Sequence, residues 1–588
     1  MLKRILLVIN FILILNFTLS AQTINLKIVE TSDVHGAIFP YDLKNDRPSN
    51  SSLAQVMTYL RQERSNPDQH IILLDNGDIL QGDPIVYYYN FERTDTTHLY
   101  ADVMNYMQYD AGTVGNHDIE AGHDVYDKFN EELNFPWLAA NIVRTSDGKP
   151  YFKPYTMIEI GLLRIAVLGL ITPSIPNWLP EKIWEGMEFQ DMIESAKKWV
   201  KEIKLREQPD MIIGLFHAGV DYTYAGQNVD SYKNENASKL VAEQVPGFNI
   251  IFVGHDHAGW NFKVRNSLGE DVLILGSLAG AQTVAVANLT LSFDKICEMW
   301  SIDSIEGEIV SIKEYEIDTE FMTKFSPALN EAKQYVNRKI GEFSQTITSR
   351  DAIFGPSEFT DIVHTIQLEL TGADISFTAP LAINTEIKAG DVFVRDMFNL
   401  YRYENLLYTM TLSGEEIKNY LEFSYANWFN QMSNENDHLL KFKKDENGNI
   451  RYSERSKSPE LEERFYNYES AAGIYYTVDV SKPEGERVSI TGFTNGAPFE
   501  LNKHYKVAIN SYRGNGGGGH LTRGAGIPNA ELSGRVLDST EKDLRYYMMK
   551  WIEKQGTIDP EVFNNWKVVP EDWWQRGMKK DYKIMFGR

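Results

Sequence analysis

The sequence predicts a two-domain α/β protein, and three observations support this fold class. The chain has 588 residues, more than one hydrophobic core usually holds. Between residues 24 and 258, apolar runs typical of strands alternate with amphipathic helical segments, as expected for a layered α/β domain. A charged helix, predicted over residues 320–338, then leads into a second α/β region that begins at residue 347.

The first region has a regular order of elements. Beyond residue 258 it becomes richer in strands. Strands are predicted at residues 24–31, 70–75, 111–115, 137–141, 163–171, 211–216, 250–253, 272–277, 284–293 and 309–317. Helices are predicted at residues 53–64, 99–107, 126–133 and 189–206.

The second region mixes the two kinds of element. Helices are predicted at residues 363–370, 414–423 and 540–553, and strands at 406–412, 474–480 and 505–509. The charged segment 435–463 is predicted to be a surface loop. The tail contains Trp566, Trp573 and Trp574, and such an aromatic-rich segment is expected to pack back on the body.

The composition limits the partners that the chain can bind. A net charge of −24 argues against binding to nucleic-acid polymers, because such a surface repels phosphate backbones. A small phosphate ester can still bind where metal ions supply positive charge locally. The only cysteine, Cys297, is predicted to be a core residue, so the chain is expected to hold together without disulfides.

Residues 1–21 have the features of a signal peptide. A basic start at Lys3 and Arg4 precedes a mostly apolar run over residues 5–19, and small residues follow near a cleavage point. A membrane anchor is the alternative, but the run is short and asparagines interrupt it. We therefore expect an exported protein of the periplasm or cell surface, with no membrane span after cleavage. We also expect the protein to act as a monomer.

Metal-ligating side chains follow five of the apolar runs. The central stretch is residues 113–120, Thr-Val-Gly-Asn-His-Asp-Ile-Glu, which holds an amide, an imidazole and carboxylates close together. The other four runs, residues 28–35, 71–78, 211–217 and 250–257, end in similar groups. Any single Asp or His among them can be a helix cap or a satisfied polar residue. Five such strand ends together favour a metal site over coincidence.

The side chains at these ends suit a centre of two divalent cations. Two such ions, about 3.5–4 Å apart, can clamp a phosphate ester and activate a water between them. The predicted ligands are Asp33, His35, Asp78, Asn116, His217, His255 and His257, with Asp78 as the candidate bridge. His117 is then left to face the substrate. Without a thiolate, this set allows Mn, Zn, Co or Fe. Asp118 and Asp256 are expected to be capping or supporting groups.

These motifs resemble a known family. The stretches Asp33-x-His35, Gly77-Asp78, Gly115-Asn-His-Asp118, His217 and Gly254-His-Asp-His257 look like the metallophosphoesterase signature. Their order and the chain length resemble the 5'-nucleotidase and 2',3'-cyclic-nucleotide phosphodiesterase family of exported bacterial enzymes, over nearly the whole mature chain. The resemblance implies a four-layer α/β/β/α calcineurin-like domain and a C-terminal α/β nucleotidase substrate-binding domain. The predicted boundaries are 1–21 (signal peptide), 22–318 (metallophosphoesterase domain), 319–345 (connector helix), 346–540 (substrate-binding domain) and 541–588 (C-terminal helix and tail).

The resemblance also implies roles for single residues at the metal site. One metal would be held by Asp33, His35, Asp78 and His257, and the other by Asp78, Asn116, His217 and His255. His117 would be the catalytic histidine. In 5'-nucleotidases an aspartate three residues later orients this histidine, and here Glu120 stands at that position. The resemblance leaves open whether the longer side chain reaches the imidazole.

The C-terminal domain of the family stacks the nucleoside base between two aromatic rings. The matching residues here are Tyr468 and Tyr512, and Asn515, Gly516 and Gly517 of the following loop are further predicted contacts. Stacking contributes about 1–3 kcal/mol per base. Core packing is the alternative for each ring, and Tyr466, Tyr475 and Tyr476 compete with Tyr468 for the role.

Two departures from the 5'-nucleotidase branch bear on the substrate. Gly518 stands where that branch has an aspartate that contacts ribose hydroxyls, and residues 379–384 replace its Gly-Gly-Gly-Ile-Arg stretch. Both departures favour 2',3'-cyclic nucleotides and 3'-nucleotides. A 5'-nucleotidase or nucleotide-sugar hydrolase is the nearest alternative. A non-catalytic nucleotide-binding protein and a polysaccharide hydrolase are alternatives of other classes.

Overall fold

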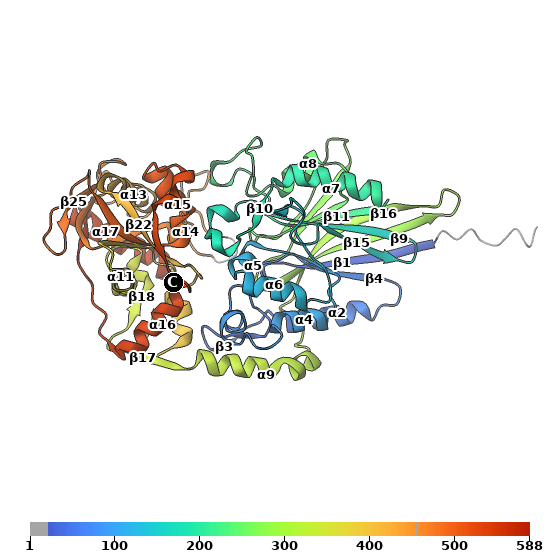
Figure 1. The fold of residues 1–588 in the computed structure, drawn as a ribbon, viewed down its shortest axis with the longest axis horizontal. Helices are drawn as coiled ribbons and strands as arrows, with labels where there is room; N and C mark the ends of the chain where they lie inside the picture. Colours follow the sequence, from blue (N-terminus) through green and yellow to red (C-terminus); the bar gives the residue numbers. More distant parts are fainter. Residues whose placement is uncertain (1–21, 454–456, 588) are drawn as a thin grey trace, which may run out of the picture.

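The N-terminal domain is built on two six-stranded sheets, and Figure 1 shows it beside the C-terminal domain. The computed structural model describes residues 22–453 and 457–587, so the predicted signal peptide lies outside the described residues. The first sheet has the order β16-β15-β1-β4-β5-β6, with bounds Met299–Ser311, Thr283–Asp294, Gln22–Thr31, His70–Asp75, Ala111–Thr113 and Trp137–Leu138. The second has the order β13-β14-β12-β11-β9-β8, with bounds Trp260–Arg265, Asp271–Gly276, Ile250–Val253, Met211–His217, Leu163–Ile171 and Tyr155–Ile160.

The two sheets pack face to face and helices cover their outer sides. Between the sheets lies a core of buried aliphatic side chains such as Ile28, Leu74, Val167 and Leu215. Against the first sheet pack α2 (Leu53–Arg64), α4 (Leu99–Met107), α6 (His123–Glu132) and α9 (Thr319–Val336). Against the second pack α7 (Met192–Arg206) and α8 (Ser238–Gln244). The predicted four-layer α/β/β/α arrangement is therefore confirmed.

Parallel pairing brings the ends of the central strands together. In the first sheet β1 pairs parallel with β4, and β4 pairs parallel with β5. In the second sheet β11 pairs parallel with both β9 and β12. Loops at the carboxyl ends of parallel strands leave a sheet at one edge, which is where open α/β sheets bind ligands. The site therefore forms where these edges of the two sheets meet.

The helix that connects the two domains is shorter than the predicted connector helix, residues 319–345. Helix α9 begins after the cap Asp318, whose side chain accepts a hydrogen bond from Phe321 N, and it ends at Val336. Its residues Phe321, Phe325 and Leu329 belong to the N-terminal core. The chain then forms β17 (Lys339–Phe343), which pairs with strands of the C-terminal domain. The connector is thus a packed helix followed directly by a strand.

The C-terminal domain has a five-stranded central sheet of order β23-β19-β26-β22-β27. Its strands are Ser470–Ala472, Ile375–Thr378, His504–Asn510, Leu407–Ser413 and Val536–Ser539. Three-stranded sheets flank it: β21-β17-β28 and β25-β24-β29, where β21 is Gly390–Phe393, β28 Thr557–Ile558, β25 Val488–Phe493, β24 Ile474–Asp479 and β29 Trp566–Val569. The main helices are α11 (Glu358–Thr371), α12 (Val394–Leu400), α13 (Gly414–Trp428), α16 (Leu544–Gln555) and α17 (Glu571–Phe586).

The aromatic tail packs as predicted, because Trp573 and Trp574 of α17 pack against the same core as Trp566 of β29. Two other predictions fail. Of the strand expected at 309–317, only residues 309–311 lie in a strand, at the end of the longer β16 (Met299–Ser311). The hairpin turn between β15 and β16 carries Cys297, which is exposed rather than buried. No helix among residues 22–453 and 457–587 is long and apolar enough to cross a membrane.

Candidate metal centre

The seven predicted ligands converge from both sheets of the N-terminal domain. Asp33 and His35 follow β1, Asp78 follows β4, and Asn116 begins α5 (Asn116–Glu120) after β5. His217 is the last residue of β11, and His255 and His257 follow β12. The sheets pack together and these strands end at the same edge, so residues up to 224 positions apart in the chain become neighbours (Asp33 and His257).

One group of donors brings four of the predicted ligands together. Single donor atoms of Asp33, His35, Asp78 and His257 all lie within 4.8 Å of one another. The Nε2 atoms of His35 and His257 are 3.1 Å apart, a distance that requires a proton or a cation between their lone pairs. The Nδ1 of His35 lies 3.0 Å from the carbonyl oxygen of Gln81, to which it donates, so Nε2 is the free ligand atom.

A second group forms around Asn116. Its Oδ1 lies 2.7 Å from Nδ1 of His255 and 3.1 Å from Nε2 of His217. The other nitrogen of each ring is held from outside: His217 Nδ1 lies 2.6 Å from the Asn76 carbonyl, and His255 Nε2 lies 3.3 Å from Glu235 Oε1. These outer contacts fix which nitrogen of each ring faces the centre.

Asp78 lies between the two groups. Its Oδ1 is 3.2 Å from Nε2 of His217, and its Oδ2 is 3.9 Å from Nε2 of His35. Oδ2 is buried and has no hydrogen-bond partner among the described residues. A buried carboxylate oxygen left unpaired is costly, so a cation is the partner that fits this position. The donor set of carboxylate, amide and imidazole fits divalent metal ions.

The electrostatics of the centre favour positive charge. Burial lowers the pKa of His217, yet the charge of Asp78 outweighs burial and raises this pKa to about 10. The same attraction is available to a metal cation. Burial lowers the pKa of His35 to about 4, so this ring is neutral near pH 7, as a metal ligand must be.

The backbone of the centre is strained. Few non-glycine residues adopt positive φ, and such residues tend to gather at functional sites. Five of the seven predicted ligands do so, with φ between 49° and 75°: Asp33, His35, Asp78, His255 and His257. Each lies in a loop shortly after a strand, where the left-handed backbone conformation turns a polar side chain toward the edge of the sheet.

Supporting groups hold these loops as predicted. The carboxylate of Asp118 accepts hydrogen bonds from the backbone N–H groups of Asp78, Ile79, Leu80 and Gly115. Asp256 accepts hydrogen bonds from Val220 N, Ala258 N and the indole of Trp260. A Cβ atom on Gly115 would lie 2.3 Å from Asp78 Oδ1, so only glycine allows α5 to approach this closely.

His117 stands at the rim of the centre. Its Nδ1 is 2.5 Å from Glu120 Oε2, and its backbone N–H donates to Asp78 Oδ1 at 2.9 Å. Its ring lies 5.5 Å from that of His35. The side chain is 26% exposed, whereas those of Asp78 and His217 are almost fully buried. His117 is therefore placed to meet a ligand that approaches the buried groups.

The predicted substrate loop lies next to this rim. Tyr512 belongs to α14 (Ser511–Gly514) and is half-buried. Asn515 follows it and donates to the Trp178 carbonyl of the N-terminal domain at 3.4 Å. Trp178 stacks on His255, with ring centres 5.6 Å apart. Gly516 has φ +100°, and a Cβ on Gly517 would lie 2.6 Å from the ring of Tyr512.

Tyr468 requires a correction, because its ring is not available to a nucleoside. The residue is fully buried, and its ring stacks on Trp428 at 5.3 Å with an angle of 7° between the planes. Tyr466, two residues earlier, is half-buried and lies 6.1 Å from Tyr403. Of Tyr466 and Tyr468, only Tyr466 has a ring that is partly open to a ligand.

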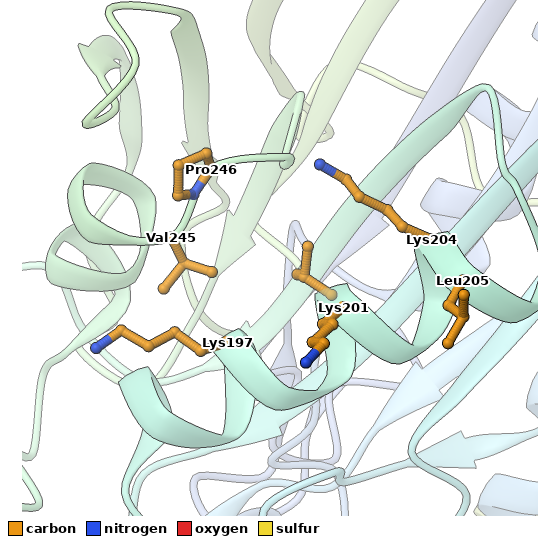
Figure 2. A pocket seen from close by; sticks show the side chains of 7 residues that line it. Lys197, Lys201, Lys204, Leu205, Val245 and Pro246 are labelled. Carbon is orange, nitrogen blue, oxygen red and sulfur yellow. The ribbon is translucent and has the colours of Figure 1, made fainter.

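A separate groove lies on the outer face of the second sheet (Figure 2). It is lined by side chains of α7 and of the segment after α8: Lys197, Val200, Lys201, Lys204, Leu205, Val245 and Pro246. None of the predicted site residues lines it. One of its lysines is already paired, since Lys197 lies 2.9 Å from Glu194. The groove is not part of the metal centre.

Comparison with known proteins supports the division into two domains. Residues 26–259 match the family described as calcineurin-like phosphoesterase. Residues 339–523 match the family described as 5'-nucleotidase, C-terminal domain. The first match contains all seven predicted metal ligands, and the second contains Tyr466 and Tyr512.

Curated relatives match most of this chain. A trifunctional nucleotide phosphoesterase protein of Bacillus subtilis is 26% identical over 94% of this chain, which spans only 39% of that protein. A 2',3'-cyclic-nucleotide 2'-phosphodiesterase/3'-nucleotidase of Yersinia enterocolitica is 25% identical, over 94% of this chain and 89% of the relative. The protein of that name from Haemophilus influenzae is also 25% identical, over 93% and 88%.

Two solved structures share the fold. A Staphylococcus aureus protein assigned to the 5'-nucleotidases has a TM-score of 0.74 and 23% identity, over 92% of this chain and 99% of that one. A 5'-nucleotidase precursor from Thermus thermophilus has a TM-score of 0.59 and 20% identity, over 93% and 100%. The fold and the site together define a two-domain metallophosphoesterase. The chain joins a calcineurin-like phosphoesterase domain to a 5'-nucleotidase C-terminal domain, and the predicted class, a hydrolase of phosphate esters, is confirmed.

Proposed function

We propose that this chain is a dinuclear-metal hydrolase of nucleotide phosphate esters that prefers 2',3'-cyclic nucleotides and 3'-nucleotides. The observation that carries the proposal is the position of Asp78. It lies between two sets of imidazole and oxygen donors, and its buried Oδ2 has no partner among the described residues. A carboxylate that binds two cations explains both facts.

The ligands divide into two sets around this bridge. Asp33, His35, Asp78 and His257 would hold one cation, and Asp78, Asn116, His217 and His255 the other. When bound, such cations neutralise charge on a phosphate ester and activate water for attack. The ligand types allow Mn, Zn, Co or Fe.

His117 and Glu120 form the proposed catalytic pair. Glu120 accepts the hydrogen on Nδ1 of His117, which leaves Nε2 to meet the substrate. Burial lowers the pKa of His117, but the charges of Asp78 and Glu120 raise it to about 9. A positive imidazole at the rim can stabilise charge on phosphate or give a proton to the leaving ribose oxygen.

The nucleoside would bind between the metal centre and the C-terminal domain. We propose that Tyr466 and Tyr512 provide the aromatic walls for the base, and that Asn515, Gly516 and Gly517 form the loop around it. Aromatic faces accept every base, so weak base selectivity is expected.

Two observations support the preference for the 2' and 3' positions. Gly518 leaves the loop without the carboxylate that would repel a phosphate on that side of the ribose. The Yersinia, Haemophilus and Salmonella relatives named for cyclic-phosphodiesterase and 3'-nucleotidase activity match over most of their length.

A 5'-nucleotidase is the second candidate, because relatives of that name from Vibrio species are 24% identical over 68% of this chain. A protein that binds nucleotides without catalysis is less consistent with a complete ligand set. We further propose that the chain is exported, with residues 1–21 as its signal, and that it scavenges nucleotides as a monomer outside the cytoplasm.

Initial rates of phosphate release test the proposal. The mature protein with added manganese is assayed on 2',3'-cyclic AMP (with excess phosphatase to reveal ring opening), 3'-AMP and 5'-AMP. Faster turnover of the first two supports it. Preference for 5'-AMP selects the second candidate. If none of the three compounds is turned over, the proposal that the substrates are nucleotides is wrong.

A further inference from the structure

A buried arginine joins the two segments that carry the aromatic walls. Arg513 follows Tyr512 and is 1% exposed. One of its guanidinium nitrogens, Nη2, donates to the carbonyl of Tyr466 at 3.0 Å, and Nη1 donates to the carbonyl of Gly517 at 2.7 Å. Both also donate to Asn467 Oδ1 at 3.1 Å. A single side chain thus sets the distance between the Tyr466 segment and the Tyr512 loop.

Arg513 is itself held in place by a buried ion pair. Its Nε donates to Glu469 Oε1 at 2.9 Å, and both side chains are 1% exposed. The other carboxylate oxygen of Glu469 accepts a hydrogen bond from the Tyr420 hydroxyl of α13, and Glu469 N donates to Ser424 Oγ of the same helix. Because both partners are anchored, the planar guanidinium has one orientation.

The same guanidinium occupies the space beside Gly518. This glycine has φ +69°, and a Cβ added to it would lie 1.9 Å from Nη1 of Arg513. Gly526, eight residues further along, has a similar φ of +76°, but a Cβ there meets nothing within 4 Å. A side chain at either position would strain the backbone, because both residues have positive φ. Only at position 518 would it also clash with Arg513.

We propose that Arg513, held by Glu469, is the positioning and specificity-determining residue of the nucleoside cleft. It fixes the spacing between the walls formed by Tyr466 and Tyr512. It also excludes any side chain, and therefore any ribose-binding carboxylate, from position 518. The inference rests on the proposed function, since it concerns the binding of the nucleoside at that site.

The alternative is a purely structural ion pair, and the two roles predict different kinetics. A structural defect lowers the amount of folded enzyme and so reduces every activity together. A positioning defect weakens the binding of nucleosides and spares a substrate without a base. Bis(p-nitrophenyl) phosphate is such a substrate, because it offers a phosphodiester to the metal centre but carries neither a nucleobase nor a ribose.

The first test compares Arg513→Met and Arg513→Lys with the unmodified full chain, using 3'-AMP and bis(p-nitrophenyl) phosphate. For Arg513→Met, the KM for 3'-AMP is expected to rise at least about tenfold, as for the displacement of one stacking ring. The kcat/KM for bis(p-nitrophenyl) phosphate is expected to stay within about twofold. Arg513→Lys should fall between, because lysine keeps the charge without the fork of donors. Equal losses on both substrates, or no change on either, overturn the inference.

A second pair of variants decides the matter if Arg513→Met does not fold. Gly518→Ala should raise the KM for 3'-AMP at least about tenfold relative to Gly526→Ala, since only the former displaces Arg513. Identical kinetics in the two glycine variants contradict the inference. An unmodified protein that cleaves bis(p-nitrophenyl) phosphate but no nucleotide contradicts the proposed function instead.

Discussion

The Nδ1 atom of His117 lies 2.5 Å from the Oε2 atom of Glu120, three residues further along α5. Residues three apart on a helix share a face, so the longer side chain of glutamate still reaches the imidazole. The carboxylate is 7% exposed and the imidazole 26%. The pair is therefore anchored on its inner side and open on its outer side, as a group that meets a substrate must be.

Removing either member of this pair should slow turnover without unfolding the protein. His117→Ala is expected to lower kcat by about 10²- to 10⁴-fold, the range for loss of a general acid. Glu120→Gln is expected to lower kcat by about 10- to 100-fold, as for partners that orient metal-ligating histidines. Steady-state rates, with circular dichroism for folding, provide the measurement. Glu131→Gln on the exposed side of α6 is the control, and a Glu120→Gln rate equal to the control rate shows that the contact does not orient His117.

The two tyrosines of residues 466–468 should respond differently to truncation. Tyr466→Ala and Tyr512→Ala are each expected to raise the KM for nucleotides by about 5- to 150-fold, equivalent to the loss of 1–3 kcal/mol of stacking. Tyr468→Ala is expected to lower the free energy of unfolding by about 3–5 kcal/mol, because it opens a cavity against Trp428. Nucleotide kinetics and urea unfolding measure the two effects. A large KM change in Tyr468→Ala with unchanged stability would restore the original assignment of Tyr468.

Replacing Asp78, the proposed bridging carboxylate, should reduce metal content directly. Asp78→Asn keeps the size of the side chain and removes the charge that both cations need. We expect fewer metal ions per chain by mass spectrometry and turnover lower by several orders of magnitude. Metal addition is expected to raise the Tm of the unmodified protein and to leave that of the variant unchanged. Asp102→Asn, on the exposed side of α4, is the control. Full metal content in Asp78→Asn is the outcome that rejects the bridge.

Acid should destabilise the C-terminal domain through His364. This side chain is 1% exposed, and its ring nitrogens lie 2.9 Å from Ser376 Oγ and 3.2 Å from Ser470 Oγ. Burial lowers its pKa to about 3, whereas the unfolded value is about 6.5. The unfolded state therefore binds the proton more readily, so stability is lost as pH falls below about 6.5. Between pH 7 and pH 5 the loss from this group is about 2 kcal/mol.

The test is urea unfolding at both pH values. His364→Gln should remove most of that pH-dependent loss, whatever its effect at pH 7. His504 on β26 is exposed, so His504→Gln is the matched control. An unchanged pH slope in His364→Gln shows that another group governs acid sensitivity.

The candidate metal centre could be predicted from the sequence, because each predicted ligand is marked by the residues next to it in the chain. Each predicted ligand lies at or shortly after the end of an apolar strand, and polar residues such as Asp33 and Asn116 are costly to bury without a partner. Parallel strands end at one edge, so the pattern alone implied convergence. The layered α/β class followed from the same strand–helix alternation, whereas the four-layer arrangement followed from the family resemblance.

The residues of the proposed nucleoside site were harder to predict, because their exposure depends on packing between segments that are distant in the sequence. Tyr466 and Tyr468 lie on either side of Asn467 in a short helical turn, and the stack on Trp428 of α13 decides which ring is buried. No local pattern encodes that choice. Cys297 was predicted to be a core residue, although a hairpin turn carries it at the surface.

The central claim is that Asp78 bridges two metal ions, and an anomalous X-ray difference map of crystals grown with manganese tests it most directly. The account predicts two peaks about 3.5–4 Å apart, one on each side of the Asp78 carboxylate. One should lie among Asp33, His35 and His257, and the other among Asn116, His217 and His255. A single peak, or a pair that Asp78 does not join, would contradict it.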